Sequence, residues 1–301
     1  MPPVSARDHL ILQGIILIWG VTSVLGKMIT LPPETLVVWR TGMAAGALGL
    51  WFLVRGWRVR FGMWERRALL NGCLIGLHWY LFFLAARLGN VSTMLTGIAT
   101  MALWVALLEP LVVKDRRMHL SECLLALVVT GGVALVAGSG EVSLPCLFTG
   151  VLAAAVAALF SICNARIVRH VPALTMTLCQ MVTAAVFCGM LSLITIGTDA
   201  EKWLPATSDW LPLLALSLLC TVVAFSVCVW LQRRVPAFTI GIASNLEPVY
   251  GILLATAVWP ATEVMGWRFY AGAAIIIGCV AIHAMGSRRA ASSPVAPTLP
   301  G

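Results

Sequence analysis

The chain has 301 residues, of which 60% are hydrophobic and 11% are charged, against roughly 25% charged residues in an ordinary soluble domain. Its net charge of +8 would suggest nucleic-acid binding in a soluble protein, but the apolar residues occur in blocks of membrane-spanning length. The composition therefore indicates a multi-pass membrane protein. The short segments between the blocks leave no room for a soluble catalytic domain.

The apolar blocks predict ten transmembrane helices, so the expected fold is an all-α membrane protein. A short segment, 1–9, precedes the first helix, and a polar tail, 287–301, follows the last and is expected to be disordered. The predicted helices cover residues 10–29, 35–54, 68–86, 92–113, 120–138, 146–165, 173–196, 210–232, 237–258 and 267–286.

Basic residues concentrate at one end of the predicted helices. Of the 20 lysines and arginines, Lys27, Arg87, Lys202 and Arg268 lie at the other end, and Arg40 lies inside a helix. The remaining 15 lie at the end that holds the N-terminus. Since short cytoplasmic loops carry the excess of Lys and Arg, both termini are predicted to be cytoplasmic, in the inner membrane of the cell. This distribution also explains the net charge without a nucleic-acid partner.

Short matches relate the first five predicted helices, 10–138, to the last five, 146–286. Gly97-Ile98-Ala99-Thr100 recurs as Gly241-Ile242-Ala243-Ser244. Two further pairs share a spacing of 139 residues: Lys27 with Arg166, and Pro33 with Pro172. A unit of five helices returns the chain on the opposite side of the membrane, so the pattern predicts two inverted five-helix repeats.

Glu247 is the most informative single residue. It lies about ten residues into the apolar run 237–258, near the middle of a hydrocarbon layer of about 30 Å. Because a carboxylate is costly there, we interpret it as a site that binds a cationic group or carries a proton. The alternative is a protonated carboxyl group that bonds to Asn245, Ser244 or a neighbouring helix. Pro248 removes a backbone donor and predicts a kink beside it.

Two more ionisable side chains lie within predicted helices. His78, beside Trp79 and Tyr80 in the middle of its helix, is a candidate proton relay or solute ligand, or a neutral ring bonded to a helix carbonyl. Arg40 is a candidate partner for an anionic group or an acid. Alternatively, it extends to the interface as arginines near helix ends commonly do.

Further candidates are polar or aromatic. Thr96, Thr100 and Trp104 are spaced i, i+4 and i+8 and share one face of the predicted helix 92–113, which predicts a cavity wall or a plain packing surface. The remaining candidates, which either line a cavity or join helices, are Trp19, Ser23, Ser161, Asn164 and Tyr250.

The sequence lacks the motifs of several enzyme and pump classes. It has no phosphate-binding P-loop, no HExxH and no GxSxG motif, and its nine cysteines include no CxxC pair. We therefore expect no ATP-driven pumping, no metal and no cofactor, and we expect the cysteines to be core residues. Three readings stay open: a transporter, an intramembrane enzyme with Glu247 and His78 as acid and base on a lipid-like substrate, and a binding protein without turnover.

Several of these segments resemble the EamA-type transporters of the drug/metabolite transporter superfamily. They are Ile18-Trp19-Gly20 with Lys27, Arg40, Asn245-Leu246-Glu247-Pro248-Val249 and Glu263, and the resemblance covers about residues 10–286. It implies a secondary transporter in which two five-helix halves move about a central cavity. The expected solute is a small organic metabolite such as an amino acid, an amine or an amphipathic compound, moved outward. A proton is the candidate coupling ion. Leu103-Trp104 depart from the family, which often has a proline there.

Overall fold

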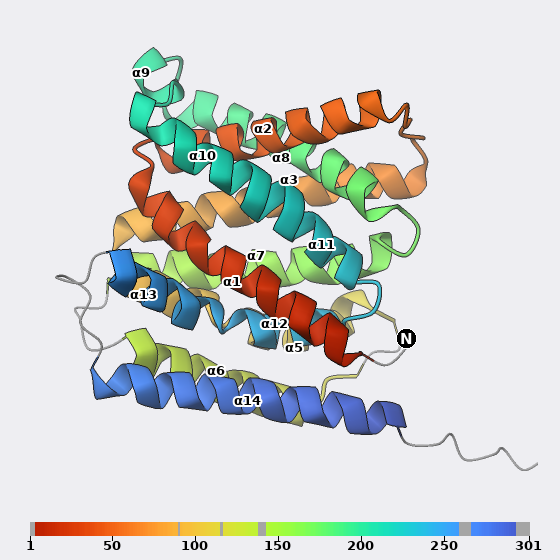
Figure 1. Ribbon diagram of the computed structural model, residues 1–301, viewed down its shortest axis with the longest axis vertical. Helices are drawn as coiled ribbons and strands as arrows, with labels where there is room; N and C mark the ends of the chain where they lie inside the picture. Colours follow the sequence, from red (N-terminus) through yellow and green to blue (C-terminus); the bar gives the residue numbers. More distant parts are fainter. Residues whose placement is uncertain (1–3, 90, 115–116, 138–142, 259–265, 293–301) are drawn as a thin grey trace, which may run out of the picture.

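The computed structural model describes residues 4–89, 91–114, 117–137, 143–258 and 266–292 (Figure 1). In these ranges the chain is helical apart from short turns and loops, with no strand. Of the predicted tail 287–301, residues up to Ser292 continue the last helix, and 293–301 lie outside the described residues, as does Glu263. Arginine and alanine, which favour helices, account for this extension.

The first half of the chain forms α1 (Ala6–Met28), α2 (Pro33–Val54), α3 (Met63–Leu88), α4 (Val91–Ile98), α5 (Met101–Val112) and α6 (Leu120–Ala137). The second half begins with α7 (Leu144–Ile167), α8 (Ala173–Thr195), the short α9 (Ala200–Trp203) and the 3-10 turn η1 (Thr207–Asp209). It continues with α10 (Trp210–Ser217), the π-helical turn η2 (Leu218–Val223), α11 (Ala224–Leu231), α12 (Ala237–Ser244), α13 (Glu247–Val258) and α14 (Trp267–Ser292).

Seven helical segments in the described ranges are long and apolar enough to cross a membrane. They are α1, α2, α3, α4 with α5, α7, α8, and the run from α9 through α11. Shorter apolar helices occupy 120–135 and 270–283. The chain is therefore an all-helical membrane protein. Ten crossings and an inverted relation of the halves remain predictions.

Three predicted helices are not regular throughout. The predicted helix 92–113 is interrupted at residues 99–100, where the N–H and the hydroxyl group of Thr100 both donate to the Gly97 carbonyl, at 3.2 and 2.7 Å. The predicted helix 237–258 is interrupted at 245–246, just before Pro248. The predicted helix 210–232 contains the π-helical turn. Interruptions of this kind are tolerated in a membrane where they line a cavity or are buried in protein.

The helices stack in layers and run in roughly the same direction or its reverse (Figure 1). The start of α1 and the end of α14 lie at one end of the bundle, and α9 lies at the opposite end. We call the end that holds the start of α1 the N-terminal end. The side on which the cytoplasm lies stays a prediction from the charges. Glycines allow close helix contacts: a Cβ on Gly72 of α3 would meet the Gln180 carbonyl oxygen of α8 at 2.7 Å.

Candidate functional site: a central cavity

A central cavity lies among α1, α3, α4, α5, α7, α11, α12 and α13, and α2 adds one side chain, Arg40. It encloses about 1000 Å³ of empty space, including its open mouth. Most of its wall is apolar, with few charged or hydrogen-bonding groups. This composition is typical of sites that bind small organic molecules.

Arg40 is held from two sides at the wall of the cavity. It is only 2% exposed, its Nε donates to the Thr221 hydroxyl oxygen at 2.8 Å, and its guanidinium lies 3.9 Å from the centre of the Trp79 ring. Its Nη1 has no hydrogen-bond partner among the described residues. The alternative that Arg40 extends to the interface is therefore wrong. A buried guanidinium with an unused donor is suited to bind an anionic group.

The π-helical turn η2 makes this arrangement possible. In a π-turn the backbone bonds span five residues, so some carbonyl groups are displaced from their helical partners. Trp19 of α1 donates its ring N–H to the Cys220 carbonyl oxygen at 3.3 Å, and the Thr221 hydroxyl donates to the Leu216 carbonyl oxygen at 2.9 Å. Thr221 thereby turns its oxygen toward Arg40. The turn thus positions both Trp19 and Arg40, which line the cavity.

Glu247 faces the same cavity from the first residue of α13. At the preceding break, the N–H groups of Asn245 and Leu246 bond to carbonyls three residues back, and the Asn245 side chain donates to the Gly241 carbonyl oxygen at 3.0 Å. Pro248 carries no N–H that would bridge the break. A carboxylate is favoured at a helix N-terminus. The carboxylate of Glu247 and the guanidinium of Arg40, both on the cavity wall, interact electrostatically.

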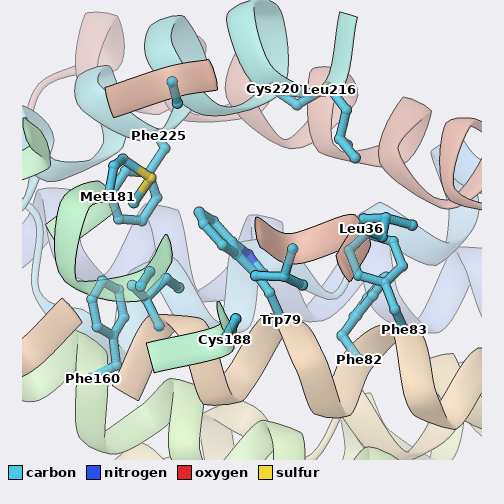
Figure 2. Packing of buried hydrophobic residues seen from close by; sticks show 14 of the residues in the cluster. Leu36, Trp79, Phe82, Phe83, Phe160, Met181, Cys188, Leu216, Cys220 and Phe225 are labelled. Carbon is cyan, nitrogen blue, oxygen red and sulfur yellow. The ribbon is translucent and has the colours of Figure 1, made fainter. Parts of the chain in front are cut away.

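Aromatic rings form one wall. Trp79 meets Phe225 edge-on with ring centres 5.5 Å apart, and Phe225 stacks on Phe160 at 5.8 Å. Figure 2 shows Trp79 between this pair and a second pair, Phe82 with Phe83. Because these rings pack into a buried cluster, the wall is stiff, and its shape is set before any ligand binds.

The other polar groups of the cavity come from α3, α7 and α12. The His78 ring lies on the wall, and its Nδ1 is 3.0 Å from the Ala153 carbonyl oxygen. This contact matches the second predicted role, a ring bonded to a helix carbonyl. Ser161 and Asn164 of α7 also line the cavity, and so do Ser244 and Asn245. The Ser244 hydroxyl donates to the Ile240 carbonyl oxygen at 2.9 Å.

Six predicted candidates do not line the cavity. Thr96, Thr100 and Trp104 lie away from the cavity, and Leu95, Ile98 and Met101 of the same segment line its wall instead. Tyr80 is half-buried elsewhere on α3. Ser23 donates to the Gly20 carbonyl oxygen at 3.0 Å, and Tyr250 donates to Gln13 at 3.1 Å, both where α1 meets α13.

Sequence reasoning missed three polar residues that the structure assigns to this region, and the first, Thr22, lines the cavity from α1. Gln232 lines the cavity and donates to the Ser161 hydroxyl oxygen at 3.0 Å. Thr221 positions Arg40, and only a prediction of the π-turn would have revealed it. Within the described ranges, no group of three or more His, Cys, Asp or Glu side chains is arranged to hold a metal ion. All nine cysteines are free.

Comparisons with known proteins place the chain in a family. The profile of the EamA-like transporter family matches residues 9–138 and again residues 144–285, once in each half. No curated protein matches the chain. A solved structure titled "Crystal structure of protein" matches with a TM-score of 0.73 and 20% identity, over 96% of this chain and 100% of that chain, and supports the fold alone. The chain therefore belongs to the EamA-like transporter family, within the drug/metabolite transporter superfamily, and is a membrane transporter.

Proposed function

We propose that the protein is a secondary transporter that exports a small apolar amino acid by alternating access. The observation that carries this proposal is the pairing of two opposite charges, Arg40 and Glu247, on one otherwise apolar cavity. The unused Nη1 of Arg40 binds the carboxylate of the solute, and Glu247 binds its ammonium group. The aromatic wall receives the apolar side chain.

The charges need a zwitterion to be satisfied together. An amine alone leaves the Nη1 of Arg40 without an acceptor, and a carboxylate alone gives Glu247 no ammonium group to bind, so each compound forfeits one charged contact in the site. Charge-assisted hydrogen bonds contribute about 1.5–3 kcal/mol each, which corresponds to roughly 10–100-fold in affinity. The charge balance therefore favours a zwitterion and supports an amino acid as the solute.

The interrupted helices and the family support alternating access as the mode of transport. Two halves that each contain an interrupted helix provide elements that rock against each other about a central site. Proton coupling rests on Glu247, which gives up its proton when the ammonium group binds and regains it when the solute leaves. The outward direction rests on the family resemblance.

Solute flux into sealed proteoliposomes tests the proposal with three matched compounds. Leucine carries both charges, 3-methylbutylamine lacks the carboxylate, and 4-methylpentanoate lacks the amine. We expect saturable, protein-dependent flux of leucine and at least about tenfold weaker competition by the other two, since each forfeits one charged contact. Protein-free liposomes correct for passive leakage of the amine.

A matched substitution examines the role of Arg40. Arg40→Lys keeps the charge but loses the planar donor fork and its stacking on Trp79, so we expect a weaker apparent affinity for leucine. Substitution of the exposed Arg58 by Lys serves as the control. The proposal is wrong if 3-methylbutylamine is carried as well as leucine, or if leucine flux is indifferent to Arg40→Lys.

A further inference from the structure

Three amide side chains meet deep in the bundle, one from each of α3, α7 and α8. Asn71 and Gln180 both donate to the side-chain oxygen of Asn164, at 2.8 and 2.5 Å, and Asn71 also reaches the Phe160 carbonyl oxygen at 3.4 Å. Asn71 is 4% exposed, and the other two are fully buried. We call these three residues the amide cluster.

The amide cluster has three hydrogen-bonding groups without a partner. The Asn71 oxygen, the Asn164 nitrogen and the Gln180 oxygen are buried and have no partner among the described residues. Exchanging oxygen and nitrogen in all three amides does not remove the deficit, because one end of Asn164 still bridges the other two residues. A buried polar group without a partner is unfavourable, so these three groups favour a further hydrogen-bonding partner.

The amide cluster lies between two hollows. Asn164 lines the central cavity, and Asn71 lines a second hollow, the inner pocket, which also includes Trp64, Arg67, Cys163 and Arg166. Because α3 begins and α7 ends there, the inner pocket lies toward the N-terminal end of the bundle (Figure 1). A solute that leaves the central cavity on this side meets the amide cluster first.

The amide cluster joins both halves of the chain. Gly72 of α3, in the first half, packs against the backbone of α8 beside both Asn71 and Gln180. Asn164 of α7, in the second half, reaches these two residues through two side-chain bonds. An opening movement that breaks these bonds joins the two hollows.

We propose that Asn71, Asn164 and Gln180 form the inner gate of the transport route, and that their unused amide groups bind the polar end of the solute as it passes. The proposal rests on the proposed transport function only for the identity of the solute. The barrier between the two hollows is a property of the protein itself and is measured without a solute.

Two natural cysteines report on the two hollows. Cys228 lines the central cavity, and Cys163 lines the inner pocket. A variant that keeps only these two cysteines is placed in sealed membrane vesicles of each orientation and treated with a membrane-impermeant thiosulfonate. The vesicle face from which Cys163 reacts identifies the side of the inner pocket, so the test needs no assumption about topology.

From the Cys163 face, we expect Cys163 to react and Cys228 to be protected. Asn164→Ala should speed the reaction of Cys228 from this face by about tenfold or more, because it removes both bonds that close the gate. Asn164→Leu, which has a similar volume, should keep Cys228 protected and stop transport. The control is Thr177→Ala, a buried polar residue of α8 whose hydroxyl bonds only its own helix.

The alternative is that the amides only hold the helices together. Asn164→Ala would then lower the unfolding temperature and leave the reactivity of Cys228 unchanged, which would overturn the proposal. Equal reactivity of Cys228 and Cys163 in the parent protein would overturn it as well. If Asn164→Ala does not fold, Asn71→Ala removes one of the same bonds and is judged by the same criteria. A failure of leucine transport affects the solute assignment and leaves these labelling rates unaffected.

Discussion

The two halves of the chain share a pair of arginine contacts that only the structure reveals. Arg87, at the end of α3, donates to the carbonyl oxygens of Ile29 and Leu31 at 2.9 and 3.1 Å. Arg233, just after α11, donates in the same way to two carbonyl oxygens of the α7–α8 loop, at 2.9 and 3.1 Å. The two loops lie at opposite ends of the bundle (Figure 1). We call this contact of one arginine with two carbonyl oxygens of a loop an arginine clamp. Each half has one, at opposite ends of the bundle, which supports the predicted inverted repeat.

The halves differ where their interrupted helices reach the centre. The spacing of 144 residues between Gly97 and Gly241 also matches Leu103 with Glu247 and Trp104 with Pro248. The first half therefore has neither the acid nor the proline at these positions. The Leu103 and Trp104 side chains pack in an apolar cluster away from the cavity. The first half instead contributes Arg40, which Thr221 of the second half holds in place. The duplicated frame is thus shared, whereas the acid and the cation come from different halves.

The largest effect should follow from removing the acid. Glu247→Gln preserves shape but cannot bind a cation or carry a proton, so we expect it to abolish leucine accumulation driven by a pH gradient. The shape-preserving change at the matching position, Leu103→Met, should leave transport near the parent level. Both are measured in proteoliposomes with an imposed pH gradient.

An exchange assay sharpens this result. If Glu247 only carries the proton, Glu247→Gln should still exchange labelled for unlabelled leucine across the membrane. If Glu247 binds the ammonium group, exchange should be lost too. Full gradient-driven transport by the Gln variant would remove Glu247 from the mechanism, and a large defect in Leu103→Met would contradict the asymmetry between the halves.

The sequence predicted more of the frame than of the site. Hydropathy located the helices, and the rarity of membrane carboxylates identified Glu247, because both follow from the cost of polar groups in hydrocarbon. The face of Thr96, Thr100 and Trp104 was misplaced, since residue spacing assumes an uninterrupted helix. The π-turn at Thr221 depends on contacts between distant helices, which local patterns do not encode.

A smaller effect, on the unfolding temperature, should distinguish alanine substitutions of the two matched glycines, Gly97 and Gly241. A Cβ on Gly97 would lie 2.8 Å from three backbone atoms of α7, whereas a Cβ on Gly241 would approach Ala102 to only 3.3 Å. Overpacking against backbone costs about 1–3 kcal/mol, and replacing Gly by Ala in a helix gains about 1 kcal/mol. We therefore expect Gly97→Ala to lower the unfolding temperature in detergent and Gly241→Ala to change it little.

Gly42 provides the reference for the glycine pair, because no atom lies within 4 Å of a Cβ built there. Gly42→Ala therefore reports the gain in helix propensity alone. Equal unfolding temperatures for Gly97→Ala and Gly241→Ala would mean that the α4–α7 contact is no tighter than the α5–α12 contact.

The smallest effects should come from the two arginine clamps, and here the halves should agree. Arg87 and Arg233 are exposed, so solvent screening reduces the contribution of each pair of bonds to about 1 kcal/mol, below the range for a buried charged donor. Arg87→Gln and Arg233→Gln should lower the free energy of unfolding by similar amounts, because glutamine is too short to span both carbonyls. Their effects should add in the double variant, since the clamps lie at opposite ends of the bundle. Arg58→Gln, with an exposed side chain, is the control. A loss confined to one clamp would show that the loops are not equivalent, and the structural support for an inverted duplication would then rest on the interrupted helices alone.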